Sequence, residues 1–269
     1  MEAHYRIMID EIVQSAFASI HPTLFLHVFF ISVVFYALKC LYLFVVLRAS
    51  GRYRQPTSRI VGKDLKILIV GDSTAVGTGA QDEHNTIGGF LARDFPNTDI
   101  MNLGVNGSKT CAVLDQLAQV HDTTFNMIII STGGNDVWAF TRLSKLRAHF
   151  VNILREAKRM SDHQVIVLFF GNEGSAPFFP FFLRRLIMGR TDSVQKVFSE
   201  VAYIEQVPLI ELFSDPKENP FVRNPKMYFA QDGLHPNDHG YWEWYKHIWR
   251  LMTNKNFIYR EEKKKVTNS

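Results

Sequence analysis

Three residues of this 269-residue chain carry the side chains needed for nucleophilic attack on an ester, although they lie far apart in sequence. Ser73 comes shortly after the apolar run 66–70, whereas Asp232 and His235 stand near the other end of the chain. A serine hydroxyl is a poor nucleophile until a base takes its proton, and histidine commonly serves as that base. A carboxylate that accepts from the other imidazole nitrogen fixes the tautomer of the histidine. The sequence therefore predicts a serine hydrolase with Ser73 as nucleophile, His235 as base and Asp232 as its acidic partner.

The elements that must position these residues are short apolar runs separated by helical stretches. The predicted strands are 66–70, 99–103, 127–130, 165–170 and 208–212. The predicted helices are 88–94, 110–121, 143–160, 191–205 and 237–252. Several of the strand runs are apolar without interruption, which is typical of strands covered on both faces. The alternation predicts a three-layer α/β/α domain with a five-stranded parallel sheet and right-handed crossovers.

Two further loops with polar and glycine residues follow predicted strands, at 103–107 (LGVNG) and 132–136 (TGGND). In open α/β sheets, ligands bind outside the carboxyl ends of the strands, where such loops present their side chains. Each loop by itself is equally well explained as a turn or a helix cap. Because the loops fall at strand ends in the order that a catalytic site needs, we favour the catalytic interpretation.

These motifs resemble the signature blocks of the SGNH (GDSL-type) serine hydrolase family of esterases and lipases. The resemblance covers about residues 66–252 and is carried by Gly71-Asp72-Ser73, by Gly104 with Asn106, by Gly133-Gly134-Asn135-Asp136, and by Asp232-Gly233-Leu234-His235-Pro236. One departure is Thr74, which stands where a leucine gives the GDSL type its name. The resemblance implies a flavodoxin-like SGNH hydrolase fold and cleavage of acyl esters or thioesters through an acyl-serine intermediate. It implies no metal and no cofactor.

The resemblance also implies an oxyanion hole made of the backbone N–H groups of Ser73 and Gly104 and the side-chain amide of Asn135. Loss of one such donor typically raises the barrier by about 3–4 kcal/mol. A glycine at 104 is expected to let its amide approach the substrate closely, because it has no side chain.

Residues 171–190 (GNEGSAPFFPFFLRRLIMGR) break the alternation with two prolines and a dense group of aromatic side chains. The aromatic residues are Phe178, Phe179, Phe181 and Phe182. They are expected to form either an ordinary packed helix start or a substrate-binding wall for an acyl chain. The second interpretation favours a lipid or fatty-acyl substrate over a sugar acetate.

The run 24–47 (LFLHVFFISVVFYALKCLYLFVVL) is apolar all round and would be about 36 Å long as a helix, enough to span a bilayer. A signal peptide and a buried globular helix fit this run less well. Five basic residues follow it between 48 and 63, and positive residues favour the cytoplasmic side of a membrane. The sequence thus predicts a single-pass membrane protein with a cytoplasmic catalytic domain. The opposite topology stays open, since large domains can be translocated regardless of charge.

The predicted organisation has five parts. They are an N-terminal tail at 1–23, a transmembrane helix at 24–47, a basic juxtamembrane linker at 48–64, an SGNH hydrolase domain at 65–254 and a polar C-terminal tail at 255–269. The net charge of +4 owes much to the linker and the final tail. No basic stripe interleaved with aromatic residues points to nucleic acid, so the predicted partners are an acyl ester and a membrane.

Other functional classes were weighed against hydrolysis. The loop 71–79 lacks the Gly-Lys-Ser/Thr ending of a phosphate-binding loop, and Pro236 and Asn237 replace the glutamate that follows the first histidine of a zinc-protease helix. An acyltransferase that uses the same acyl-enzyme stays open, as does a non-catalytic membrane-tethered binding module.

Overall fold

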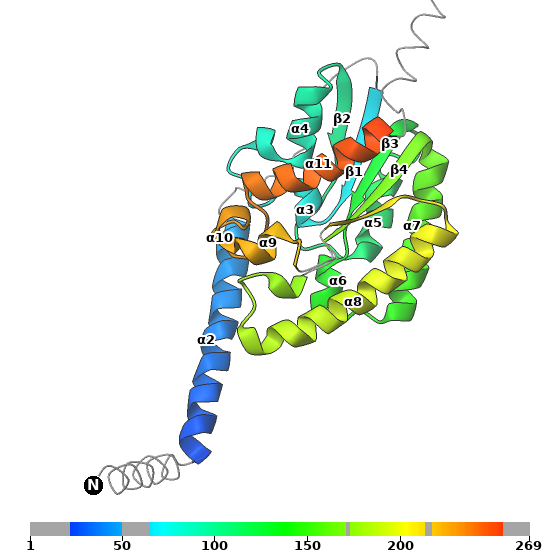
Figure 1. Cartoon of the computed structure of the whole chain (residues 1–269). Helices are drawn as coiled ribbons and strands as arrows, with labels where there is room; N and C mark the ends of the chain where they lie inside the picture. The colour runs from blue at the N-terminus through cyan, green and yellow to red at the C-terminus, as the bar shows by residue number, and fades with distance from the viewer. Residues whose placement is uncertain (1–21, 50–64, 171–172, 213–216, 255–269) are drawn as a thin grey trace, which may run out of the picture. The chain divides into compact units, whose positions relative to one another are not determined.

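The computed structural model describes residues 22–49, 65–170, 173–212 and 217–254 (Figure 1). The predicted C-terminal tail and almost all of the predicted N-terminal tail and linker lie outside these ranges. The chain divides into two compact units, Met1–Arg52 and Tyr53–Ser269.

In the first unit, the described residues form the long helix α2 (Pro22–Ala49). Large apolar side chains of its first half are exposed, with Phe25 at 75% and Phe35 at 72%. Among the residues that the structure describes, no helix combines the length and the apolar character needed to cross a bilayer. The helix predicted over 24–47 is therefore present, whereas its crossing of a membrane has no support from the described residues.

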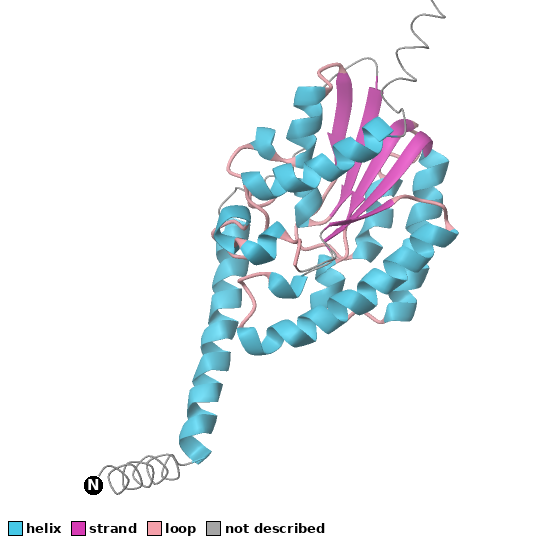
Figure 2. Cartoon of the chain, viewed as in Figure 1, coloured by secondary structure: helices cyan, strands magenta, loops and turns pink. Residues whose placement is uncertain are grey.

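The second unit is built on a five-stranded sheet with the order β2-β1-β3-β4-β5 (Figure 2). The strands are β1 (Leu65–Gly71), β2 (Thr98–Asn102), β3 (Phe125–Ser131), β4 (Ser161–Phe170) and β5 (Leu209–Leu212). All four neighbouring pairs are parallel, as predicted. The middle residues of β1, β3 and β4 are fully or almost fully buried, because helices cover both faces of the sheet.

Two groups of helices enclose the sheet, which gives the expected three layers (Figure 1). One face carries α5 (Val113–Ala118), α7 (Leu143–Met160) and α8 (Phe181–Ile204), and the other carries α4 (Ile87–Asp94) and α11 (Asp238–Asn254). Buried residues of α7 recur at helical spacing, from Leu146 through Phe150, Ile153 and Leu154 to Ala157, and this stripe packs toward β4 and α8. The predicted helix 143–160 has the same bounds in the structure.

The helix predicted over 191–205 is longer than expected and begins at Phe181. Pro180 stands at its N-cap, where the fixed φ of proline and its missing N–H are tolerated. The prolines of this stretch thus precede the helix and do not interrupt it.

The remaining elements are short. They are α3 (Ser73–Val76), α6 (Gly134–Trp138), α9 (Pro220–Arg223), α10 (Pro225–Tyr228) and the 3₁₀ turns η1 (Glu83–Asn85), η2 (Thr110–Ala112) and η3 (Glu173–Ser175). Three of them, α3, α6 and η3, follow the carboxyl ends of β1, β3 and β4, so their side chains gather at one rim of the sheet.

Candidate active site

The turn that presents Ser73 is fixed by close backbone packing at the end of β1. Gly71 has φ +140°, and a Cβ there would overlap the carbonyl oxygen of Ser131 on the neighbouring strand. The side chain of Gln116 clamps the same residue, since its Oε1 accepts from the Gly71 N–H at 2.7 Å and its Nε2 donates to the Gly71 carbonyl at 2.8 Å. A glycine is therefore required at this strand end, and the direction in which the chain leaves β1 is set.

Ser73 is the first residue of α3, and Asp72 caps that helix. Asp72 Oδ1 accepts from the backbone N–H of Thr74 at 2.9 Å and from its hydroxyl at 2.7 Å. The N–H groups of a first helical turn have no partner within the helix, so such a cap stabilises the turn that carries the nucleophile. Asp72 thus has a structural role, because it caps the helix that begins with Ser73.

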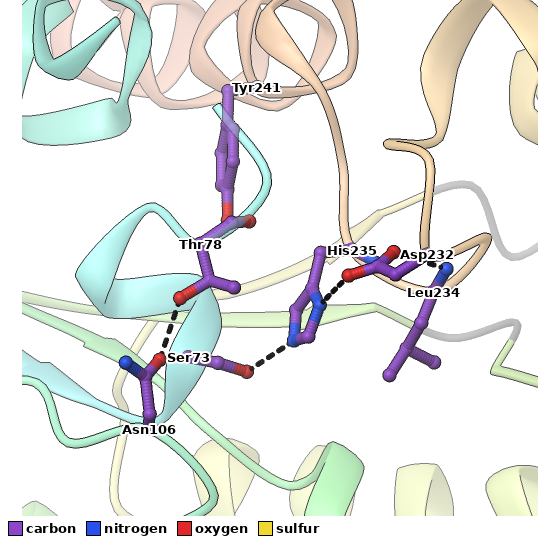
Figure 3. Close-up of polar contacts among 7 residues, drawn as sticks. All are labelled: Ser73, Thr78, Asn106, Asp232, Leu234, His235 and Tyr241. Carbon is purple, nitrogen blue, oxygen red and sulfur yellow. Dashed lines mark hydrogen bonds and ion pairs between the residues drawn. The ribbon is translucent and has the colours of Figure 1, made fainter. Parts of the chain in front are cut away.

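The structure brings Ser73, His235 and Asp232 into one hydrogen-bonded chain (Figure 3). His235 Nε2 lies 2.9 Å from Ser73 Oγ, and His235 Nδ1 lies 2.6 Å from Asp232 Oδ2. When Asp232 is ionised it can only accept, so the imidazole proton lies on Nδ1 and Nε2 is left to accept from the serine hydroxyl. This is the arrangement in which histidine can act as a base toward serine.

Asp232 is held as a carboxylate. Burial alone would raise its pKa, but hydrogen bonds from the His235 ring and from the backbone N–H groups of Leu234 and His235 lower the pKa below its ordinary value. The two backbone donors lie 2.8 and 3.0 Å from Asp232 Oδ1. The carboxylate therefore shapes its own loop while it orients the imidazole.

The loop that carries the acid and the base is tied to the segment before α8. The N–H of Phe178 donates to the carbonyl of Gly233 at 2.9 Å, and the N–H of Ala230 donates to the carbonyl of His235 at 2.8 Å. Gly233 has φ +70°, a conformation that glycine adopts readily. These bonds hold His235 against the turn of Ser73.

The predicted oxyanion donors behave differently from one another. Within the described ranges the Ser73 N–H makes no hydrogen bond, and Asn135 lines the cavity next to Ser73. Asn135 Nδ2 donates one proton to the Ser108 carbonyl at 2.9 Å, which leaves a second proton for a ligand. Both are therefore placed to donate to a substrate.

Gly104 does not fit its predicted role. Its N–H donates to Asn102 Oδ1 at 2.9 Å in a buried environment, so it is already used. A Cβ at this position would lie 3.0 Å from both Ala75 Cβ and Val76 N. The glycine is thus explained by the close packing of the loop on α3, and not by approach to a substrate.

Gly107, in the same loop, has a backbone N–H that the sequence analysis did not consider as a donor. Its N–H has no hydrogen bond in the part of the chain that the structure describes, its φ is +74°, and a Cβ there would meet nothing within 4 Å. The next residue, Ser108, is the one that binds Asn135. The Asn106-Gly107 pair, typical of a turn with positive φ, was the available signal. The Asn106 side chain in turn accepts from Thr78 Oγ1 at 2.6 Å, and Tyr241 OH donates to the Thr78 carbonyl at 2.7 Å (Figure 3).

A small cavity of about 50 Å³ opens beside Ser73 and His235. Its apolar walls come from Trp138, Leu168, Phe170 and Trp244, and its polar walls include Ser131, Thr132, Asn135 and Glu173.

The four predicted substrate-binding phenylalanines are not among the residues that line this cavity. Phe178 and Phe179 are buried, with ring centroids 5.3 and 5.0 Å from that of Trp138, so they support a wall from behind. Phe181 and Phe182 are exposed at the start of α8. The prediction of a direct wall for the substrate is not met in this cavity.

Two further acidic groups lie at the cavity and were not predicted to act there. Burial raises the pKa of Asp72 to about 6, although the hydrogen bonds from Thr74 lower it. Burial, together with the negative charge of Asp72, raises the pKa of Glu173 to about 8. Within the described ranges, no three His, Cys, Asp or Glu side chains are grouped closely enough to hold a metal ion.

The chain is similar to known proteins in sequence and in fold. Residues 69–243 match the family described as the GDSL-like lipase/acylhydrolase family. No curated protein sequence matches the chain. Among solved structures, a lipase/acylhydrolase from Enterococcus faecalis is 21% identical with a TM-score of 0.55, covering 71% of this chain and 96% of its own.

Two other solved structures resemble this chain with comparable identity, coverage and TM-score. A member of the lipolytic G-D-S-L family from Veillonella parvula is 17% identical with a TM-score of 0.56, covering 70% of this chain and 98% of its own. A catalytic mutant of an acetylxylan esterase from Geobacillus stearothermophilus is 18% identical with a TM-score of 0.52, covering 71% and 94%. At these identities the structural matches establish the shared fold.

Proposed function

Because this chain belongs to the GDSL-like lipase/acylhydrolase family, we propose that it cleaves acyl esters or thioesters through an acyl-Ser73 intermediate. It is an SGNH-type esterase/lipase, that is, a carboxylic ester hydrolase. The observation that carries the proposed mechanism is the hydrogen-bonded chain from Ser73 Oγ through His235 to Asp232.

In the proposed reaction, His235 Nε2 takes the proton of Ser73 as Oγ attacks the carbonyl carbon. The tetrahedral intermediate collapses when the same nitrogen returns the proton to the leaving alkoxide or thiolate. A water molecule then gives a proton to His235 and attacks the acyl-serine, which releases the acid and restores the hydroxyl. Asp232 stays ionised throughout and stabilises the imidazolium in both steps.

The negative oxygen of each tetrahedral intermediate needs fixed donors. We assign this function to the backbone N–H of Ser73, the second side-chain proton of Asn135 and the backbone N–H of Gly107. The assignment of Gly107 in place of Gly104 is supported by the hydrogen bond that occupies the Gly104 N–H.

A short acyl group fits the cavity better than the fatty-acyl group favoured by the sequence. A volume of about 50 Å³ holds only a few water molecules, which is comparable to an acetyl or propionyl group. The proposed substrate is therefore an ester or thioester of a short acid, whose alcohol or thiol part lies outside the cavity.

We also propose that the apolar segment 24–47 anchors the protein in a membrane by a single pass, with the catalytic domain in the cytoplasm. The proposal rests on the apolar sequence of this segment, in which only His27 and Lys39 can carry a charge, and on the basic residues that follow it. The protein should then resist extraction by alkaline carbonate, and a reporter fused after Ser269 should be active only as a cytoplasmic reporter. Release by carbonate would contradict the anchor, and an active exported reporter would contradict the topology.

The hydrolase proposal is tested with p-nitrophenyl esters from acetate to palmitate, using the purified protein and its Ser73→Ala variant. We expect release of nitrophenol to be fastest for acetate or propionate, to fall with acyl length, and to be lost in Ser73→Ala. Equal rates in the variant would contradict the mechanism, and a maximum at palmitate would contradict the short-acyl assignment.

A further inference from the structure

Glu173 is an acidic residue at the active-site cavity for which hydrolysis has no need. It opens η3 after the end of β4, and its side chain faces α6, where an added Cβ on Gly134 would lie 2.8 Å from its Oε1. Gly134 immediately precedes Asn135, and both glycine and glutamate line the cavity together with Ser73. The carboxyl group thus lies next to the place where an ester would react.

The Glu173 carboxyl has no protein partner in the described ranges, where it makes neither a hydrogen bond nor an ion pair. The charged and titratable groups around the cavity are Asp72 from the end of β1 and His235 from the late loop. Arg184 of α8, the helix that packs on η3, instead donates its Nε proton to the carbonyl of Phe179 at 3.0 Å. Glu173 is partly exposed, and its carboxylate would stand near the negative charge of Asp72 without a cation, so a positive group supplied by a ligand would be stabilising here.

Aromatic side chains complete the surroundings of this carboxyl. Trp138, Phe170 and Trp244 line the same cavity. Aromatic rings attract cations through their electron-rich faces, and rings combined with a carboxylate are a common way to bind an ammonium group. An apolar acyl group would use the rings but would leave the carboxyl unpaired.

From this geometry we infer that the cavity is an ammonium subsite, in which Glu173 selects short acyl esters that carry a protonated amine close to the scissile carbonyl. The inference rests on the proposed hydrolase function and specifies its substrate class. The size of the cavity limits the acyl group to a few heavy atoms, as in glycyl or β-alanyl esters.

The pKa of Glu173 supports the same conclusion. Burial and the charge of Asp72 raise it to about 8, so near neutral pH the group is mostly uncharged. A bound ammonium group would lower that pKa, because an opposite charge favours the ionised form. Ionisation of Glu173 should therefore raise kcat/KM for substrates that carry an ammonium group and lower kcat/KM for neutral substrates. As pH rises, kcat/KM should change in opposite directions for the two kinds of substrate.

The test compares β-alanine ethyl ester with ethyl butyrate, which has a methyl group in place of the ammonium. Ethanol release is measured for the full-length protein in detergent, for Glu173→Gln, and for Glu83→Gln, which changes an exposed glutamate of η1. We expect kcat/KM to favour the β-alanine ester by about tenfold or more in the unchanged protein and in Glu83→Gln, as for a buried charge pair. In Glu173→Gln the ratio should fall to about one or below, with ethyl butyrate still cleaved.

Between about pH 7 and 8.5, above the pKa of Asp72, the ratio should rise with pH in the unchanged protein and stay flat in Glu173→Gln. His235 acts as the base toward both esters, so its catalytic contribution is shared by them. A ratio near one in the unchanged protein, or a preference that survives in Glu173→Gln, overturns the ammonium subsite while leaving the hydrolase intact. If the unchanged protein cleaves neither of the two ethyl esters and none of the p-nitrophenyl esters, the hydrolase proposal is overturned, and this inference with it.

Discussion

Asp232 holds His235 in two ways with a single carboxylate. Its Oδ2 lies 2.6 Å from the ring Nδ1, while its Oδ1 accepts the backbone N–H of the same residue at 3.0 Å. The ring and the backbone of His235 are thus oriented by one group three positions away. The contact between His235 Nε2 and Ser73 Oγ, in contrast, joins distant parts of the chain and depends on the tertiary fold.

Replacement of Asp232 should disable the base while leaving the fold in place. In Asp232→Asn the amide can donate to His235 Nδ1, which favours the tautomer with the proton on Nε2 and prevents that nitrogen from accepting from Ser73. We expect kcat to fall by about 10³–10⁴ with little change in KM. The control is Asp122→Asn, which changes an exposed aspartate. A fall in kcat of less than about tenfold in Asp232→Asn would contradict the role assigned to Asp232.

Asn135 should act mainly in the transition state. Its replacement by alanine removes the side-chain donor, and we expect kcat for an activated short-chain ester to fall by about 10²–10³ while KM changes little. The same variant also loses the bond to the Ser108 carbonyl, so thermal unfolding should be recorded alongside. A rise in KM at constant kcat would show that Asn135 only binds the ground state.

The clamp between Gln116 and Gly71 predicts a loss of stability and activity together. Gln116→Ala leaves the buried N–H of Gly71 without its partner, whereas the Gly71 carbonyl keeps the Val105 N–H and the Ser108 hydroxyl as donors. We expect the free energy of unfolding to fall by about 2–4 kcal/mol and kcat to fall as well, because the turn carrying Ser73 is less well fixed. Gln119→Ala, in an exposed position one turn later, should have little effect on either quantity.

Glu173 should make stability depend on pH in a definite direction. Its pKa is raised from 4.5 to about 8 in the folded state, so between these values the folded protein binds more protons than the unfolded chain. Its contribution to stability is therefore present below pH 4.5 and is lost as pH rises toward 8, at up to about 1.4 kcal/mol per pH unit.

Glu173→Gln removes this dependence. Denaturant unfolding at several pH values should show the variant gaining stability relative to the unchanged protein as pH rises from about 5 to 8. The contribution of Asp72 has the same sign and is present in both proteins, so it largely cancels. A difference in stability that stays constant over this range would contradict the raised pKa.

The five-stranded parallel sheet was predictable because fully buried parallel strands are apolar in almost every position. Runs such as 128–130 and 165–170 are apolar in every position, since both faces of the sheet are covered. The catalytic contact was predicted from Ser73 at the end of β1 and from the block Asp232–His235 before the last helix, and the structure places Ser73 Oγ 2.9 Å from His235 Nε2.

The oxyanion loop and the substrate cavity were less predictable, because they depend on which backbone groups are already paired. Gly104 and Gly107 look alike in sequence, and only the bond from Gly104 to Asn102 distinguishes them. Phe178 is apolar and follows a strand, yet it packs behind Trp138. The sequence did not single out Glu173, because its raised pKa results from desolvation and from the nearby charge of Asp72 in the folded protein.

Activation of Ser73 as a nucleophile can be measured by covalent labelling with a fluorophosphonate probe, with the modified residue located by mass spectrometry. The unchanged protein should be labelled at Ser73 alone, and labelling should be lost in Ser73→Ala and strongly slowed in His235→Ala. Labelling of another serine, or an unchanged labelling rate in His235→Ala, would contradict activation of Ser73 by His235.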